Sequence, residues 1–322
     1  MKKRFLPILL VLVMVFTLIP SFIVLADEDE FPVDSPDIPV EPISKDFYEQ
    51  VGIRYQEYFK MVYVEGGDFT LGWQIDDQHS SAPHSPFDTA PVAASVSDFY
   101  IAETEVTQGL YNAVMNANVP FGNNRNMPKN TVSFYDVQTF LGRLYVLTGK
   151  VYRLATEAEW EFAAKGGNPG HALGHDNYLY SGSDIASEVA HTGNSASVVA
   201  ASEETRGKLV GTSNATRQPN ILGIYDMSGN IEEWVWNPWN STIVGGQDPI
   251  GVNSPVHAQR TRRGGAYQGE NFSRYSTARQ IRSIDGGDPL LGFRIALSAD
   301  QSSCPWERVG GFRKNFLQTV DN

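Results

Sequence analysis

Apolar and polar residues alternate most clearly in the stretch MVYVEGGDFTLG, from Met61 to Gly72. Alternation with a period of two places successive side chains on opposite faces of a strand, and a Gly-Gly pair between two such runs is typical of a turn. We therefore expect a β-hairpin here. A second run, VSDFYIAETEVT from Val96 to Thr107, predicts another strand that ends at a residue able to cap a helix.

Helical spacing of apolar residues follows this capping residue and recurs further along the chain. Apolar residues at positions 110, 111, 114 and 115 share one face of a helix that begins after Thr107. Ser133 and Asp136 have the spacing of a capping box at the start of a second helix, which we expect to end at Gly149.

The stretch RLATEAEWEFAAKGG predicts a third helix, capped by Thr156 and Glu159 and ended by a Gly-Gly pair. With Glu157 and Glu161, Glu159 could form a carboxylate cluster with a chemical role. Acidic residues in a first helical turn also favour the helix dipole and the cap, and we prefer that interpretation.

Beyond residue 167 the chain is irregular, with long loops rich in Gly, Ser and Asn. Few helices and short strands indicate an α+β domain, and the lack of strand–helix alternation argues against a doubly wound parallel sheet. The chain has 322 residues, of which 41% are apolar, which is enough for a sizeable core. Because no internal repeat is visible, we expect a single folded domain over residues 47–300.

The formal net charge of -12 argues against anionic partners. Binding to nucleic acid requires clustered Lys and Arg, so nucleic acid is not an expected partner. An anionic membrane surface is disfavoured for the same reason.

The N-terminal segment has the pattern of an export signal. Three basic residues precede the apolar run Phe5–Ile19, and small residues allow cleavage after Ala26, so residues 1–26 are predicted to be a signal peptide. Residues 27–46 are acidic and rich in proline, which predicts an extended linker. The expected location is secreted or in the cell envelope. The alternative is an uncleaved segment that anchors the protein in the membrane.

Cysteine and histidine offer little chemistry in this chain. The only cysteine, Cys304, lies in a C-terminal extension over residues 301–322, so neither an internal disulfide nor a thiol pair is possible. We interpret it as an exposed or intermolecularly paired thiol. His171 and His175 have the spacing of a metal-binding pair, but the glycines beside them favour a loop and no third ligand is evident.

The stretch SGNIEEWVWNPW combines two hard oxygen ligands at close spacing. Asn230 and Glu233, together with loop carbonyls such as that of Ile231, match the mixed oxygen set that Ca²⁺ prefers. The alternative is a capped turn before a core strand, in which Trp234 and Trp236 alternate. From the residues alone, the capped turn is the preferred interpretation.

The segment from Arg262 to Leu297 contains a Gly-Gly pair at 264–265, which permits close backbone approach. It also interleaves arginines with aromatic residues: Arg274, Arg279, Arg282 and Arg294 with Tyr267, Phe272, Tyr275 and Phe293. Guanidinium groups that stack on rings and pair with carboxylates can order a core rich in loops. The same groups can line a binding cleft, and the residues do not decide between the two.

Six stretches occur in a characteristic order: VYVEGGDFTLG, FYIAETEVTQGLYNAVM, YRLATEAEWEFAAKGG, NILGIYDMSGNIEEWVWN, RRGGAYQ and LGFRIAL. Together they resemble the sulfatase-modifying-factor domain, the formylglycine-generating enzyme family, over about residues 58–299. The resemblance implies an irregular single α+β domain of the formylglycine-generating-enzyme fold, related to the C-type lectin fold. It also implies bound Ca²⁺, with Asn230 and Glu233 matching one family site and Asn194 a second.

The family's enzymes oxidise a cysteine of a target sulfatase to formylglycine, using O₂ and Cu(I) held by two thiolates. Soft thiolate ligands are what Cu(I) requires. The resemblance places those cysteines just after RRGGAY, where this chain has QGENFSR, Gln268–Arg274. Copper is therefore not expected here.

Three functional hypotheses follow from this pattern. The first is a Ca²⁺-stabilised binding module whose candidate ligand contacts are Tyr267, Glu270, Phe272, Arg274 and Tyr275. Its ligand would be an extracellular peptide or glycan. The second is a metal-dependent oxidase with histidine or carboxylate ligands in the same cleft. The third is formylglycine generation itself, which the missing cysteines argue against.

Overall fold

The computed structural model describes residues 46–52, 56–73, 90–116, 124–202, 217–251 and 258–301, all within one compact unit that begins at Pro42. The predicted signal peptide 1–26, the linker 27–46 apart from its last residue, and the C-terminal extension beyond residue 301 lie outside the described residues. So do Cys304 and the side chain of Phe272.

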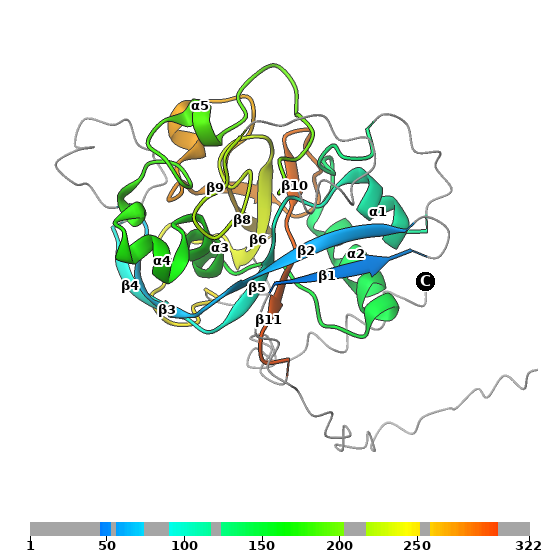
Figure 1. Cartoon of the computed structure of the whole chain (residues 1–322), viewed down its shortest axis with the longest axis horizontal. Coiled ribbons are helices and arrows are strands. Elements are labelled where there is room, and N and C mark those ends of the chain that lie inside the picture. The colour runs from blue at the N-terminus through cyan, green and yellow to red at the C-terminus, as the bar shows by residue number, and fades with distance from the viewer. Residues whose placement is uncertain are drawn as a thin grey trace, which may run out of the picture. The chain divides into compact units, whose positions relative to one another are not determined.

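Three small sheets are formed by the described residues (Figure 1). The first is antiparallel and contains, in spatial order, β1 (Phe47–Val51), β2 (Glu57–Val64), β5 (Phe99–Ala102) and β11 (Ala296–Ser298). The second contains β10 (Leu291–Phe293), β6 (Glu232–Pro238), β8 (Gln259–Arg263) and β9 (Gln280–Ser283). The third contains β3 (Gly67–Leu71), β4 (Val92–Val96) and β7 (Gly246–Gln247). Because β11 pairs with β5, the C-terminal part of the domain closes onto its N-terminal part.

The stretch Met61–Gly72 forms two strands, but the predicted hairpin between them is wrong. β2 pairs with β5 and β3 pairs with β4, so β2 and β3 follow one another along a ribbon instead of pairing together. Between them, a Cβ on Gly66 would lie 2.3 Å from the carbonyl oxygen of Val96. The Gly66 amide donates to Asp98 Oδ1 at 2.8 Å. Glycine is needed here for close backbone approach and not for a chain reversal.

Three helices lie where the sequence predicts them: α1 (Gln108–Val114), α2 (Phe134–Thr148) and α3 (Glu157–Ala164). Two shorter helices, α4 (Gly167–Ala172) and α5 (Ala186–Val189), and the 3₁₀ turns η1 (His175–Asn177) and η2 (Asn271–Arg274) lie in the part of the chain that was expected to be irregular. The Thr107 side chain caps α1, and Ser133 and Asp136 form the predicted capping box of α2. Gly149 ends α2 with a φ of 71°. Among the described residues, no helix is long and apolar enough to cross a bilayer.

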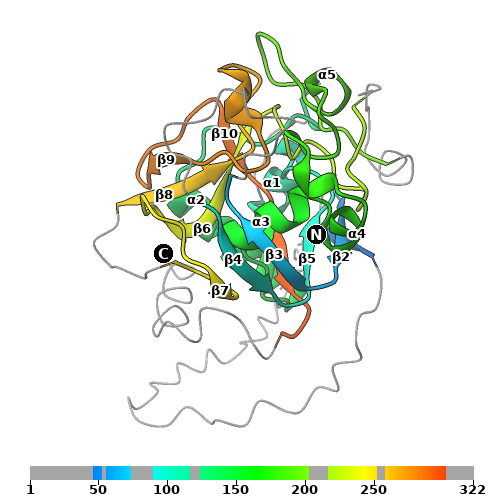
Figure 2. The same ribbon diagram turned by 90° about the vertical axis from the view of Figure 1, so that its left-hand side faces the viewer.

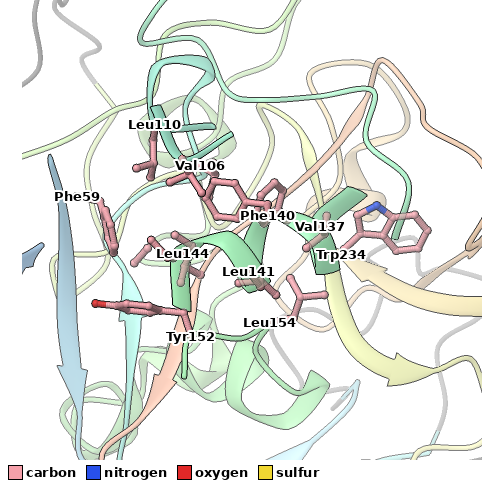
Figure 3. Packing of buried hydrophobic residues seen from close by; sticks show 14 of the residues in the cluster. Phe59, Val106, Leu110, Val137, Phe140, Leu141, Leu144, Tyr152, Leu154 and Trp234 are labelled. Atoms are coloured by element: carbon pink, nitrogen blue, oxygen red, sulfur yellow. The ribbon is translucent and has the colours of Figure 1, made fainter. Parts of the chain in front are cut away.

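Helix α2 covers the largest apolar core with the face that its periodicity predicts. Val137, Phe140, Leu141 and Leu144 are buried, and Figure 3 shows them packed with side chains from β2, α1 and β6. The Phe140 ring stacks on Tyr111 at 5.4 Å and meets Phe293 edge-on at 5.1 Å. This core ties α1 and α2 to the strands that carry the loops described below.

Helix α3 has the predicted capping box between Thr156 and Glu159, but its acidic residues do more than favour the dipole. Each of its glutamates is buried and forms an ion pair: Glu157 with Arg279, Glu159 with Arg153, and Glu161 with Arg263. Burial opposes ionisation of Glu161, yet Lys165 and Arg263 hold the pKa of its carboxyl below the usual value. The interpretation that these acids serve only the helix dipole and the cap is therefore incomplete, because the three carboxylates also neutralise buried arginines.

The predicted loop around His171 and His175 is instead helical, since His171 lies in α4 and His175 begins η1. His171 Nδ1 lies 2.9 Å from Asp176 Oδ2, and its side chain is 63% exposed. No group of three or more metal-binding acidic, histidine or cysteine side chains occurs among the described residues.

Candidate functional site

The turn between residues 226 and 230 has a constrained backbone. Asp226, Gly229 and Asn230 all have positive φ, at 57°, 81° and 58°. Such values are uncommon for residues other than glycine, and asparagine tolerates them best. The Gly229 amide donates to Gly264 O at 2.8 Å, so the turn is joined directly to the Gly-Gly pair at 264–265.

The Asn230 side chain is fully buried and bridges two segments. Its Oδ1 accepts from the Ser197 amide at 2.9 Å, and its Nδ2 donates to Glu105 Oε2 at 3.0 Å. Burial, reinforced by the charges of Asp226 and Glu233, raises the pKa of the Glu105 carboxyl well above its usual range. A cavity of about 10 Å³ beside Glu105 has room for about one water molecule, so no organic ligand fits there.

Glu233 pairs with Arg294 inside the domain. Arg294 Nε and Nη2 donate to the carboxylate at 2.8–3.1 Å, and Trp160 Nε1 donates to Oε2 at 2.7 Å. Both carboxylate oxygens are thus used by protein donors. Burial tends to lower the pKa of the Arg294 guanidinium, but the Glu233 carboxylate raises it, so Arg294 stays charged.

These contacts bear on the expected calcium site at Asn230, Ile231 and Glu233, which stays a prediction. Ca²⁺ takes six to eight oxygen ligands. The Glu233 carboxylate faces Arg294, and both polar atoms of the Asn230 side chain are engaged with protein groups. As arranged, these residues do not fit a Ca²⁺ ion. Asn194, the residue expected at the second calcium site, is exposed on a neighbouring loop.

Three loops are joined by backbone hydrogen bonds next to these buried side chains. We call them, residues 191–197, 226–230 and 264–274, the loop junction. The Tyr267 amide donates to Asn230 O at 2.8 Å, and the Gly193 amide donates to Tyr267 O at 3.0 Å. The Asn230 amide donates to His191 O at 3.1 Å. Figures 1 and 2 both place η2, in orange, at the same end of the domain as α5.

Arg274 is the organising side chain of the third loop. Its Nε donates to Ala266 O at 2.7 Å, and its Nη2 donates to the carbonyls of Tyr267 and Gly269 at 3.0 and 3.1 Å. Only 3% of the residue is exposed. Arg274 therefore supports the loop from inside and is not presented to a ligand, contrary to its expected role.

Tyr275 is also an interior residue. Its ring stacks on Trp73 at 5.5 Å and meets Tyr180 edge-on at 5.3 Å, within a small apolar cluster that includes Val189 of α5. Of the five predicted ligand contacts, Glu270 is exposed and Tyr267 is partly exposed. These two remain candidates for a binding surface.

A match to a family model follows the same boundaries as this domain. The model for the sulfatase-modifying factor enzyme 1-like domain matches residues 49–299. The chain belongs to the sulfatase-modifying factor family. The α+β fold with curled small sheets agrees with this membership, as the resemblance predicts.

Two curated proteins are similar to parts of the chain. The chaperone protein LppX of Paenibacillus barcinonensis is 31% identical across 46% of this chain and 64% of its own length. The formylglycine-generating enzyme of Streptomyces coelicolor is 31% identical across 47% of this chain and 48% of its own length. The chain thus matches about half to two thirds of the length of these curated relatives.

Among solved structures, Treponema denticola variable protein 1 superposes with a TM-score of 0.61 and 25% sequence identity. The match covers 78% of this chain and 98% of that protein. Most of the chain therefore has a counterpart in a solved structure.

Sequence reasoning missed Glu105 and the pair of Arg217 with Asp226 as parts of this site. Arg217 Nη2 donates to Asp226 Oδ2 at 3.0 Å, and Asp226 accepts from the Ala200 amide at 2.7 Å. The sequence does contain a feature that points to Glu105. In the run FYIAETEV, two acidic residues follow directly after a strongly apolar strand. A buried strand end requires such acids to have internal partners.

We expect that Ca²⁺ does not stabilise the sulfatase-modifying-factor domain, because Arg294 already neutralises Glu233. Differential scanning fluorimetry of the chain from residue 27 should give unfolding midpoints within about 1 °C in CaCl₂ and in EDTA. MgCl₂ at equal concentration controls for ionic strength. A midpoint that rises steadily with the logarithm of the Ca²⁺ concentration, and does not do so in Asn230→Ala, would restore the calcium site.

Proposed function

We propose that this chain is an extracytoplasmic binding protein of the sulfatase-modifying factor family that does not generate formylglycine. One observation carries the proposal. The loop after the Gly-Gly pair, Gln268–Arg274, contains no cysteine, and Arg274 folds it through backbone carbonyls. Cu(I) held by two thiolates does not fit a chain whose single cysteine, Cys304, lies outside this loop.

The exposed part of the loop junction has a composition suited to recognition. Gln268, Glu270 and Asn271 are exposed beside Tyr267, and Asn194 is exposed on the adjoining loop. Tyrosine supplies contact area at low entropic cost, while Ser, Gly and Asn supply adaptable hydrogen bonds, as in antibody loops. The buried layer of Glu105, Asn230 and Arg294 would hold such a surface rigid, which lowers the cost of binding.

A polypeptide is the ligand class that we infer. The similar LppX is named a chaperone protein. A chaperone role for this chain would require contacts with other polypeptides. The export signal expected in residues 1–26 supports the same compartment. A glycan is the alternative ligand, since polar loops with a partly exposed tyrosine suit either class.

The binding proposal predicts saturable binding of an unfolded polypeptide to the loop junction. Reduced, carboxymethylated α-lactalbumin on a biolayer-interferometry sensor should bind the chain from residue 27, and Tyr267→Ala with Glu270→Ala should weaken binding by about tenfold. Tyr145→Ala is the matched control, because Tyr145 is 37% exposed on α2, away from the junction. Absence of saturable binding, or equal losses in both variants, would refute the proposal. Binding confined to a glycan array would replace polypeptide by glycan as the ligand.

The proposed loss of the family's oxidation is tested separately. Incubation of the chain with a Cys-x-Pro-x-Arg peptide, Cu(I), O₂ and a thiol reductant should yield no aldehyde detectable by hydrazide trapping, because no thiolate pair is available for copper. An active formylglycine-generating enzyme in parallel shows that the assay works. Aldehyde formation that depends on this chain would overturn this part of the proposal.

A further inference from the structure

Three arginines share one face of the second sheet, and we call them the arginine face. Arg260 and Arg262 are two residues apart on β8, so their side chains point to the same side. Arg282 on β9 lies directly opposite Arg260 in the antiparallel register. Thr261 and Arg263, which alternate with them, are buried on the other side of the strand, toward α3. The arginine face is thus separate from the loop junction.

The arginine face holds more positive than negative charge. Arg262 pairs with Glu232, and Arg282 pairs with Asp288 at 3.0 Å. Arg260 has no carboxylate partner among the described residues, and its Nε and Nη1 donate no hydrogen bond there. Three guanidinium groups therefore have two carboxylates between them.

The surroundings of Arg260 make its unpaired positive charge unfavourable for folding. Its guanidinium lies 4.9 Å from the centre of the Phe134 ring. Burial lowers its pKa, and the like charge of Arg282 directly across the strands is unfavourable. An uncompensated, partly buried cation in a chain with a net charge of -12 needs an explanation that packing alone does not supply.

Part of the face can be reached from solvent, although Nε and Nη1 of Arg260 are buried. The Arg282 side chain is 35% exposed and that of Arg262 is 17% exposed. The first turn of α2 borders the face, because the Phe134 amide donates to Ile284 O at 3.1 Å just beyond β9. Tyr135, in the same turn, is 57% exposed. Figure 2 shows β8 and β9 side by side, with β9 at the edge of the second sheet.

We propose that the arginine face binds an oxyanion group of a ligand, such as a phosphate, sulfate or carboxylate, between Arg260 and Arg282. Planar guanidinium groups donate pairs of parallel hydrogen bonds that match these anions. Tyr135 at the border of the face would add a hydroxyl donor and a ring surface. The bound anion would supply the negative charge that Arg260 lacks.

The test is isothermal titration of the chain from residue 27 with sodium phosphate, sulfate or acetate, at constant ionic strength set by NaCl and at pH 8. We expect saturable binding of at least one anion, with a dissociation constant on the order of 1 mM. Phosphate and sulfate alone would identify a tetrahedral group, and acetate alone a carboxylate.

Substitutions separate the site from general charge effects. Arg260→Gln and Arg282→Gln should each weaken binding by about tenfold. Glu232→Gln should strengthen it, because at pH 8 Glu232 is ionised and holds Arg262, although burial raises its pKa to about 7. The control is Arg143→Gln, an exposed arginine of α2.

If circular dichroism shows that Arg260→Gln is unfolded, Arg282→Gln carries the test, since its side chain is more exposed. The proposal is overturned if none of the anions binds saturably, or if Arg143→Gln loses as much affinity as Arg282→Gln. Neither result bears on the loop junction, so the proposed function stands or falls independently.

Discussion

Buried pairs of glutamate and arginine connect the regular elements of this domain to its loops. Glu161 on α3 accepts from Arg263 at the end of β8, and Glu157 accepts from Arg279 just before β9. Arg263 Nη2 also donates to Ser276 O at 2.9 Å, inside the loop between these strands. Because a buried ion is costly unless fully paired, each pair constrains both its helix and its loop to one geometry.

This constraint explains how a chain with so many loops keeps a defined surface. Arg294 joins Glu233 to the carbonyls of Ala102 and Tyr225, at 2.9 and 2.7 Å, and so links the first and second sheets under the loop junction. Function in such folds resides in sites carried by the scaffold. The interior can therefore remain that of a sulfatase-modifying factor domain while the segment Gln268–Arg274 carries other chemistry.

Local features of the fold were predictable, and long-range ones were not. The caps at Ser133 and Thr156 depend on residues three positions apart, so the sequence displays them directly. The partner of β2 lies some forty residues away on β5, and the nearby Gly-Gly pair suggested a hairpin instead. For the site, the sequence singled out Asn230, whose role as a ligand stays a prediction, but its partner Glu105 lies 125 residues away. The burial of Tyr275 likewise arises only when distant segments meet, because its ring contacts are with Trp73 and Tyr180.

The central claim is that the Glu161–Arg263 pair couples α3 to the loop after β8, and a double-mutant cycle measures this directly. The free energies of unfolding in urea would be compared for the parent, Glu161→Gln, Arg263→Met and the double variant. We predict a coupling energy of about 1–2 kcal/mol, because each single change removes one ion partner of a buried charge. The remaining charge keeps a second partner, Lys165 for Glu161 and Glu157 for Arg263. Additive effects, with a coupling near zero, would contradict the account.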